Sequence, residues 1–170
     1  MIRCASRTSR AVTPAASCEL SRSSTRLYAM RRSGWWSIAS AAIATRVVTP
    51  DPLLPVIGGV GPGNQPKSKA GDLTVRALVF DDNGTRVAIC SVDFLGFPGP
   101  LCDKIRAMVK DVPGKNIVIG STHTHSAPST VRIHGYGPEE KFRQNLRAAI
   151  VDAVKSANAK LEDNCTFNYS

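Results

Sequence analysis

The middle of the chain contains short runs of apolar and β-branched residues that are separated by residues typical of turns. Residues 73–80 and 85–94 are two such runs, and Asp81-Asp82-Asn83-Gly84 between them is typical of a hairpin turn. We therefore expect two antiparallel strands. Residues 116–121 and 165–170 are also strand-like, and residues 43–48 are a candidate first strand.

Two other segments repeat apolar residues at helical spacing. The first is predicted over about residues 101–110 and ends before Val112-Pro113-Gly114, because proline and glycine interrupt a helix. The second is predicted over about residues 139–159, with Pro138 in its first turn and an apolar stripe on one side. That stripe is made of Phe142, Leu146, Ile150 and Val154.

The order strand, helix, strand over residues 85–121 predicts a crossover connection between parallel strands. Combined with the hairpin before it, this order predicts an α/β fold with a mixed sheet. Parallel strands end at the same edge of a sheet, and sites of open α/β folds collect there. We therefore expect Asp93, His123 and His125, which follow the two parallel strands, to lie at one edge.

The first 43 residues differ in composition from the rest of the chain. Residues 1–46 hold eight Arg, no Lys and one acid, Glu19, whereas the remainder has 14 basic against 12 acidic residues, a net charge of only +2. The formal charge of +9 is therefore no sign of a nucleic-acid-binding face. We interpret residues 1–43 as an Arg- and Ser-rich leader, with residues 1–29 outside the fold, and residues 44–170 as the folded part.

Two interpretations of residues 30–44 stay open. Met30-Arg31-Arg32, a short apolar stretch and an Ala-x-Ala site are arranged as in a signal peptide. Alternatively, the first strand already begins at Ile43 and the preceding residues are a transit-like leader. No stretch reaches the ~20 apolar residues of a membrane span, and the spacing of the five cysteines defines neither a disulfide framework nor a zinc knuckle.

The segment Ser121-Thr122-His123-Thr124-His125 carries the most specific chemistry in the chain. On a strand, residues i and i+2 point to the same side, so both imidazoles could bind one metal ion, although paired histidines also occur as ordinary loop residues. Asp93 stands in an apolar run, where it could orient an imidazole, bind metal or cap backbone amides. The glycine-rich residues 58–63 lack the lysine of a phosphate-binding loop and suggest a substrate-side or flexible loop. His134 is interpreted as a surface-loop residue.

From about Ala44 onward the sequence resembles the N-terminal part of the neutral/alkaline, non-lysosomal ceramidase family. Five segments carry this resemblance: Thr49-Pro50, Gly58-Gly59, residues 73–77, residues 91–96 and, above all, residues 120–128. The resemblance implies a zinc amidohydrolase that cleaves the amide of ceramide to sphingosine and a fatty acid, in a secreted or periplasmic location. It implies that His123 is the zinc ligand and that His125 lines the catalytic pocket. Asp93 is a further candidate catalytic residue because of its place at the end of an apolar strand, not because of the resemblance.

The chain also departs from that family. Its members are much longer, and their other zinc ligands, a histidine, a glutamate and a tyrosine, lie in downstream segments. Ala127 stands where many ceramidases have glycine. We therefore expect an incomplete portion of a larger catalytic domain, inactive alone, whose substrate is a ceramide-like lipid amide reached by transient contact with a membrane surface. The alternatives are another His-x-His metal hydrolase and a non-enzymatic relic.

Overall fold

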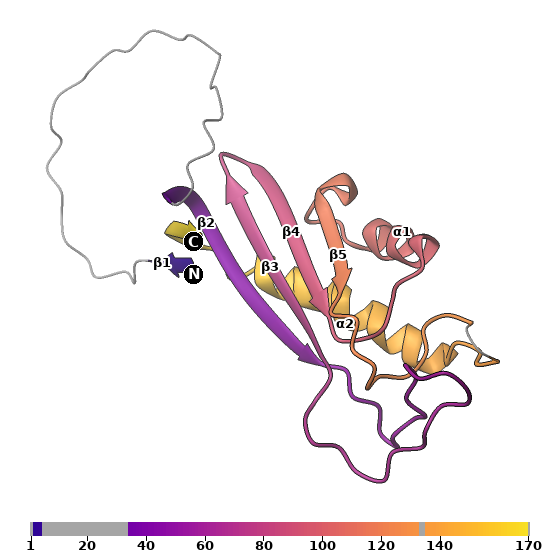
Figure 1. Cartoon of the computed structure of the whole chain (residues 1–170). Coiled ribbons are helices and arrows are strands. Elements are labelled where there is room, and N and C mark those ends of the chain that lie inside the picture. Colours follow the sequence, from indigo (N-terminus) through magenta and orange to yellow (C-terminus); the bar gives the residue numbers. More distant parts are fainter. Residues whose placement is uncertain (1, 5–33, 133–134, 170) are drawn as a thin grey trace, which may run out of the picture.

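The protein is described by a computed structural model over residues 2–4, 34–132 and 135–169. Its centre is a six-stranded mixed sheet in the order β1-β6-β2-β3-β4-β5 (Figure 1). The elements follow one another as β1 (Ile2–Cys4), β2 (Gly34–Val47), β3 (Thr74–Asp82), β4 (Thr85–Val92), α1 (Gly99–Met108), a 3-10 turn (Gly114–Asn116), β5 (Ile117–Ser121), α2 (Glu140–Asn158) and β6 (Glu162–Tyr169).

The predicted hairpin and crossover are both present. Strands β3 and β4 pair antiparallel up to the partners Asp82 and Thr85, and Asn83 has a φ of 51°, which a tight turn with Asn-Gly favours. Strand β5 then pairs parallel to β4, and α1 lies between the two along the chain. The α/β class, with its mixed sheet and strand-helix-strand crossover, is therefore confirmed.

Both helices cover the same face of the sheet. The stripe Phe142, Leu146, Ile150 and Val154 of α2 is fully buried. It packs in one cluster with small sheet residues such as Ala77 and Ala88, and the helix lies across β2 and β3. Small side chains on the sheet allow a helix to approach closely. The buried stripe of α2 therefore makes apolar contact with the sheet. Helix α1 adds Leu101 and Ile105 to the same cluster.

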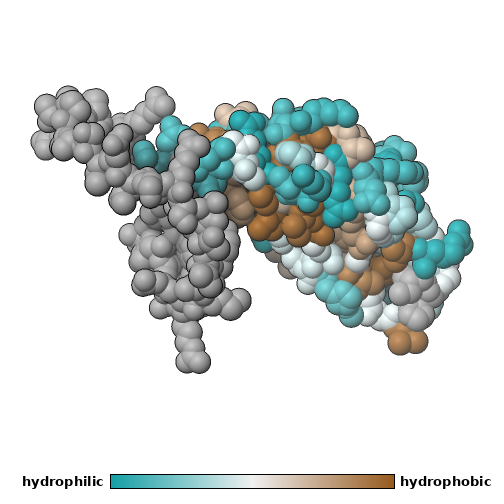
Figure 2. Space-filling model, turned by 90° about the horizontal axis from the view of Figure 1, so that it is seen from above, coloured by the Kyte–Doolittle hydropathy of each residue, from teal (hydrophilic) through white to brown (hydrophobic). Residues whose placement is uncertain are grey.

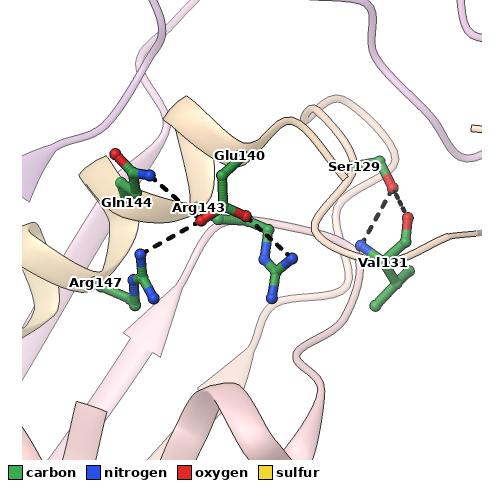
Figure 3. Close-up of polar contacts among 6 residues, drawn as sticks. All are labelled: Ser129, Val131, Glu140, Arg143, Gln144 and Arg147. Carbon is green, nitrogen blue, oxygen red and sulfur yellow. Dashed lines mark hydrogen bonds and ion pairs between the residues drawn. The ribbon is translucent and has the colours of Figure 1, made fainter. Parts of the chain in front are cut away.

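The beginning of α2 has no side-chain cap, and acidic and basic residues pair along its first turns instead. Figure 3 shows Glu140 between Arg143 and Arg147, with ion-pair distances of 3.3 and 3.5 Å. The backbone amide of Glu139 donates to the carbonyl of Ser129 at 3.3 Å. This bond connects the start of the helix to the segment that follows the two histidines.

The opposite face of the sheet is open and partly apolar. Ile43, Leu78, Ile89 and Val118 are register partners across four strands. Of these, Ile43 is 60% exposed and Val118 is 54% exposed. The neighbouring row on the helical face, which includes Ala44, Ala77 and Cys90, is buried. Figure 2 shows apolar surface next to polar surface on the described part of the molecule.

The structure corrects several expected boundaries. The strand expected from Ile43 is β2, which begins at Gly34, and Pro138 precedes α2 instead of lying in its first turn. Residues 2–4 were expected outside the fold but form β1, which pairs with β6. Pairing with a distant strand leaves no local periodicity, which is why the sequence did not reveal it. Residues 5–33 of the expected leader, and His134, lie outside the described residues.

We predict that Leu146→Ala lowers the free energy of unfolding by about 2–5 kcal/mol, because it leaves a cavity in the cluster beneath α2. Urea denaturation of the purified chain measures this loss. Val118→Ala is the matched control, since Val118 lies on the open face and its truncation should cost less than ~1 kcal/mol. Equal losses for the two variants would contradict the assignment of the core to the helical face.

Candidate functional site

The segments that follow β4 and β5 lie together at one edge of the sheet. Strand β4 ends at Val92 and β5 at Ser121, and these two residues are register partners. Pairing continues one step further, because the amide of Thr122 donates to the carbonyl of Val92 at 2.9 Å. Asp93 and the two histidines therefore leave the sheet at the same edge, as expected from parallel pairing.

His123 and His125 come together, but not for the reason that the sequence suggested. The strand ends before them, and His123 adopts a left-handed backbone with a φ of 61°. The amide of Ser126 donates to Thr124 Oγ1 at 3.3 Å, which closes a local turn. Both imidazoles are exposed, with ring centroids 5.3 Å apart and planes at 62°. Strand alternation is thus the wrong explanation, since a left-handed residue and a turn bring the rings together.

The two imidazoles line a pocket of about 240 Å³. Its other walls are the glycine-rich loop from Ile57 to Gly61, the Leu95 side chain and Tyr136. The predicted substrate-side loop thus lies beside the histidines. Leu95 and Tyr136 were not identified from the sequence. A signal for Tyr136 existed, because Gly135-Tyr136-Gly137 places an aromatic residue between two glycines in a loop.

The glycine-rich loop is attached to the histidine segment by the backbone. Ile57 forms an antiparallel bridge with Ala127, and its amide donates to the Ala127 carbonyl at 3.0 Å. Val56 and Asn64 exchange two further hydrogen bonds, at 2.9 and 3.1 Å, which close the base of the loop. Ile57 and Ala127 are both buried. Residues 57–63 therefore form a closed loop that is held against the histidine segment.

Asp93 lies outside the lining of this pocket and caps the start of β3. Its Oδ2 accepts hydrogen bonds from the Thr74 amide at 2.9 Å and the Thr74 hydroxyl at 2.6 Å, and Arg76 Nη2 lies 3.9 Å away. Partial burial works to raise the pKa of Asp93, but hydrogen bonds from Thr74 and Thr122 and the nearby Arg76 guanidinium outweigh it and hold the pKa below its ordinary value of 3.8. The geometry therefore matches the capping role that the sequence left open.

The donor chemistry of the pocket is of a kind that zinc accepts, since two imidazoles line it. Imidazole nitrogens are common zinc ligands, whereas a catalytic zinc site has about three protein ligands. Within residues 2–4, 34–132 and 135–169, no group of three or more His, Cys, Asp or Glu side chains is arranged to hold a metal. The two imidazoles His123 and His125 are therefore fewer than the protein ligands of a catalytic zinc site.

The cysteines of the described part do not add to this site. Burial raises the pKa of the Cys90 thiol to about 11, and burial also raises the pKa of Cys102. A buried thiol with a raised pKa is a poor nucleophile and a poor metal ligand at neutral pH. Cys165, on β6, is disulfide-bonded, which the cysteine spacing did not predict.

No protein-family model matches the chain, and no curated protein sequence matches it. Among solved structures, the chain is similar to a ceramidase complexed with C2, with a TM-score of 0.57 and 21% sequence identity. The similarity covers 75% of this chain and 22% of that ceramidase, so the chain spans about a fifth of the ceramidase's length. The fold is therefore ceramidase-like.

Neither described helix is long and apolar enough to cross a membrane.

We predict that Asp93→Asn lowers the free energy of unfolding at pH 7 by about 1–3 kcal/mol, because the Thr74 donors then meet a neutral acceptor in place of an ionised one. A depressed pKa contributes stability above the ordinary value of 3.8, and this stability is lost as the pH falls through the folded-state pKa. The difference between parent and variant should therefore shrink below pH 3.8. Urea denaturation at a series of pH values measures it.

Asp103→Asn is the control for this experiment. The Asp103 side chain is 75% exposed and pairs with Arg106 in its own helix, so its loss should change stability by less than ~0.5 kcal/mol. A loss for Asp93→Asn that is no larger than the control's, or that is independent of pH, would contradict the capping role of the ionised carboxylate.

Proposed function

We propose that the chain carries the N-terminal part of the active site of a ceramidase-like zinc amidohydrolase. The observation that supports this most is the convergence of His123 and His125 on one pocket, at the edge where parallel strands end. The ceramidase-like fold supports the same reaction class. In this proposal His123 is a zinc ligand and His125 acts in the pocket beside it.

His123, His125 and Asp93 each contribute a separate part of the proposed mechanism. Bound zinc would polarise the amide carbonyl and lower the pKa of a water molecule to about 7. The left-handed backbone of His123 holds its imidazole at the pocket wall. His125, 5.3 Å away between ring centroids, can accept and return a proton at an imidazole nitrogen. Asp93 acts as a positioning residue, since it bonds to Thr122, which directly precedes His123.

The pocket walls suit a substrate with hydrocarbon next to its amide. Ile57 and Leu95 provide apolar contact, and Tyr136 adds an aromatic ring with a polar end. A ceramide-like lipid amide has this combination. Because such a substrate resides in a membrane, we include transient contact with a membrane surface in the proposal.

The two imidazoles of the described site are fewer than the ligands that catalysis requires. We therefore propose that the 170 residues need further ligands, supplied from outside them, before the site is competent. Another His-x-His metal hydrolase would bind zinc in the same way and differ in substrate. A non-enzymatic relic would bind none, so the zinc measurement below separates it from both enzymes.

We predict that the chain binds zinc weakly and that His123→Ala lowers the affinity at least ~10-fold, because this variant removes the proposed direct ligand. His125→Ala should lower it less. Isothermal titration with zinc measures both, and each variant serves as the other's control. Greater loss in His125→Ala would reverse the two roles, and a parent chain without zinc binding would favour the relic.

We predict that the purified 170-residue chain does not hydrolyse ceramide even with zinc supplied, because an underfilled site lets the metal escape. Product formation from labelled ceramide measures this. Zinc-dependent turnover that disappears in His123→Ala would show that a complete site lies within these residues and would contradict the proposal of missing ligands.

A further inference from the structure

Gly58 lies where the glycine-rich loop comes closest to His125. An added Cβ at Gly58 would be 2.3 Å from His125 Cβ, 2.5 Å from its Cγ and 2.7 Å from its Cα. These atoms are the root of the side chain and the backbone, so a change of rotamer cannot relieve the overlap. Gly58 also has a φ of +144°, a conformation that other residues rarely adopt.

The loop cannot retreat easily from this contact. Its preceding residue, Ile57, is 5% exposed and hydrogen-bonds to Ala127, two residues beyond His125. At the other end of the loop, an added Cβ at Gly63 would be 2.8 Å from the Val56 carbonyl oxygen and 3.1 Å from the Tyr136 ring. The loop backbone therefore packs against two pocket side chains, and any shift in one segment passes to the other.

We propose that Gly58 is a positioning residue for His125, and that the closed loop 57–63 is the template that sets where this imidazole stands in the pocket. Absence of a side chain at residue 58 lets the His125 backbone come into contact with the loop. The catalytic importance of this placement rests on the function proposed above, whereas the placement itself does not. His123 is set differently, by its own left-handed backbone.

The same loop supplies two matched controls. Gly59 has open space around it and no positive φ, so Gly59→Ala adds a methyl group without overlap. Gly61 has a φ of +104° and open space, so Gly61→Ala adds backbone strain without overlap. Gly58→Ala adds both backbone strain and overlap. The additional loss of stability in Gly58→Ala, compared with Gly61→Ala, therefore measures the contact with His125.

The first measurement is the NMR spectrum of the histidine rings in the full chain, assigned with single His→Ala variants. In Gly58→Ala the His125 ring resonances should shift, those of His123 should shift less, and thermal unfolding should occur at least about 4 °C below that of Gly61→Ala. His125 resonances that move no more than in Gly61→Ala would overturn the proposal.

A second measurement covers the case in which Gly58→Ala fails to fold. His125→Gly removes the two closest atoms, whereas His125→Ala keeps the Cβ that an added methyl group meets at 2.3 Å. Each substitution is therefore made alone and in combination with Gly58→Ala. The loss of melting temperature, or of folding, caused by Gly58→Ala should be smaller in the His125→Gly background than in the His125→Ala background, although the contact with His125 Cα at 2.7 Å and the backbone strain at residue 58 remain in both. Equal losses in both backgrounds would overturn the proposal.

Zinc titration then distinguishes this proposal from the proposed function. If the parent chain binds zinc, Gly58→Ala should lower the affinity more than Gly61→Ala does, and an equal effect would count against the positioning role. If the parent binds no zinc, the proposed function fails, while the ring spectra and the rescue experiment still decide whether Gly58 positions His125.

Discussion

The parallel pairing of β4 and β5 is the constraint on which the site depends. It places the end of one strand beside the end of the other, and the bond from Thr122 to Val92 carries this pairing past both strands. Packing of α1 and α2 on one face of the sheet holds the pair in position. Without this pairing, Asp93 and the histidine segment would have no common edge, since Asp93 and His123 lie far apart in the sequence.

Three local devices then shape the edge into a pocket. The Asp93 carboxylate connects the start of β3 to Thr122, and the left-handed backbone of His123 contributes to the turn that brings the two histidine rings together. The bridge from Ile57 to Ala127 adds the glycine-rich loop as a wall. Strained backbone and close glycine contacts are costly, and they cluster where a site requires fixed side chains.

The open face of the sheet contrasts with this pocket. The apolar row from Ile43 to Val118 has no layer over it in the described part of the chain, although the equivalent row on the other face is covered by α2. Two-layer packing of this kind leaves one face of a sheet for solvent or for another layer. The similarity in fold to a ceramidase likewise covers only 22% of that protein's length.

The sequence by itself determined the elements whose signals are local. Asn83-Gly84 identified the hairpin, the stripe of α2 identified its buried side, and the order of elements placed Asp93, His123 and His125 at one edge. The histidine motif indicated the candidate chemistry, because imidazole nitrogens are common zinc ligands. Only the tertiary structure decided how the rings meet, that Asp93 caps β3, and that Leu95 and Tyr136 belong to the pocket. The Asp93 cap and the pocket lining arise from contacts between segments far apart in the chain, and such contacts leave no period or spacing in the sequence from which they could be predicted. The rings meet through a local left-handed conformation of His123, which is uncommon for residues other than glycine and which the strand pattern did not indicate.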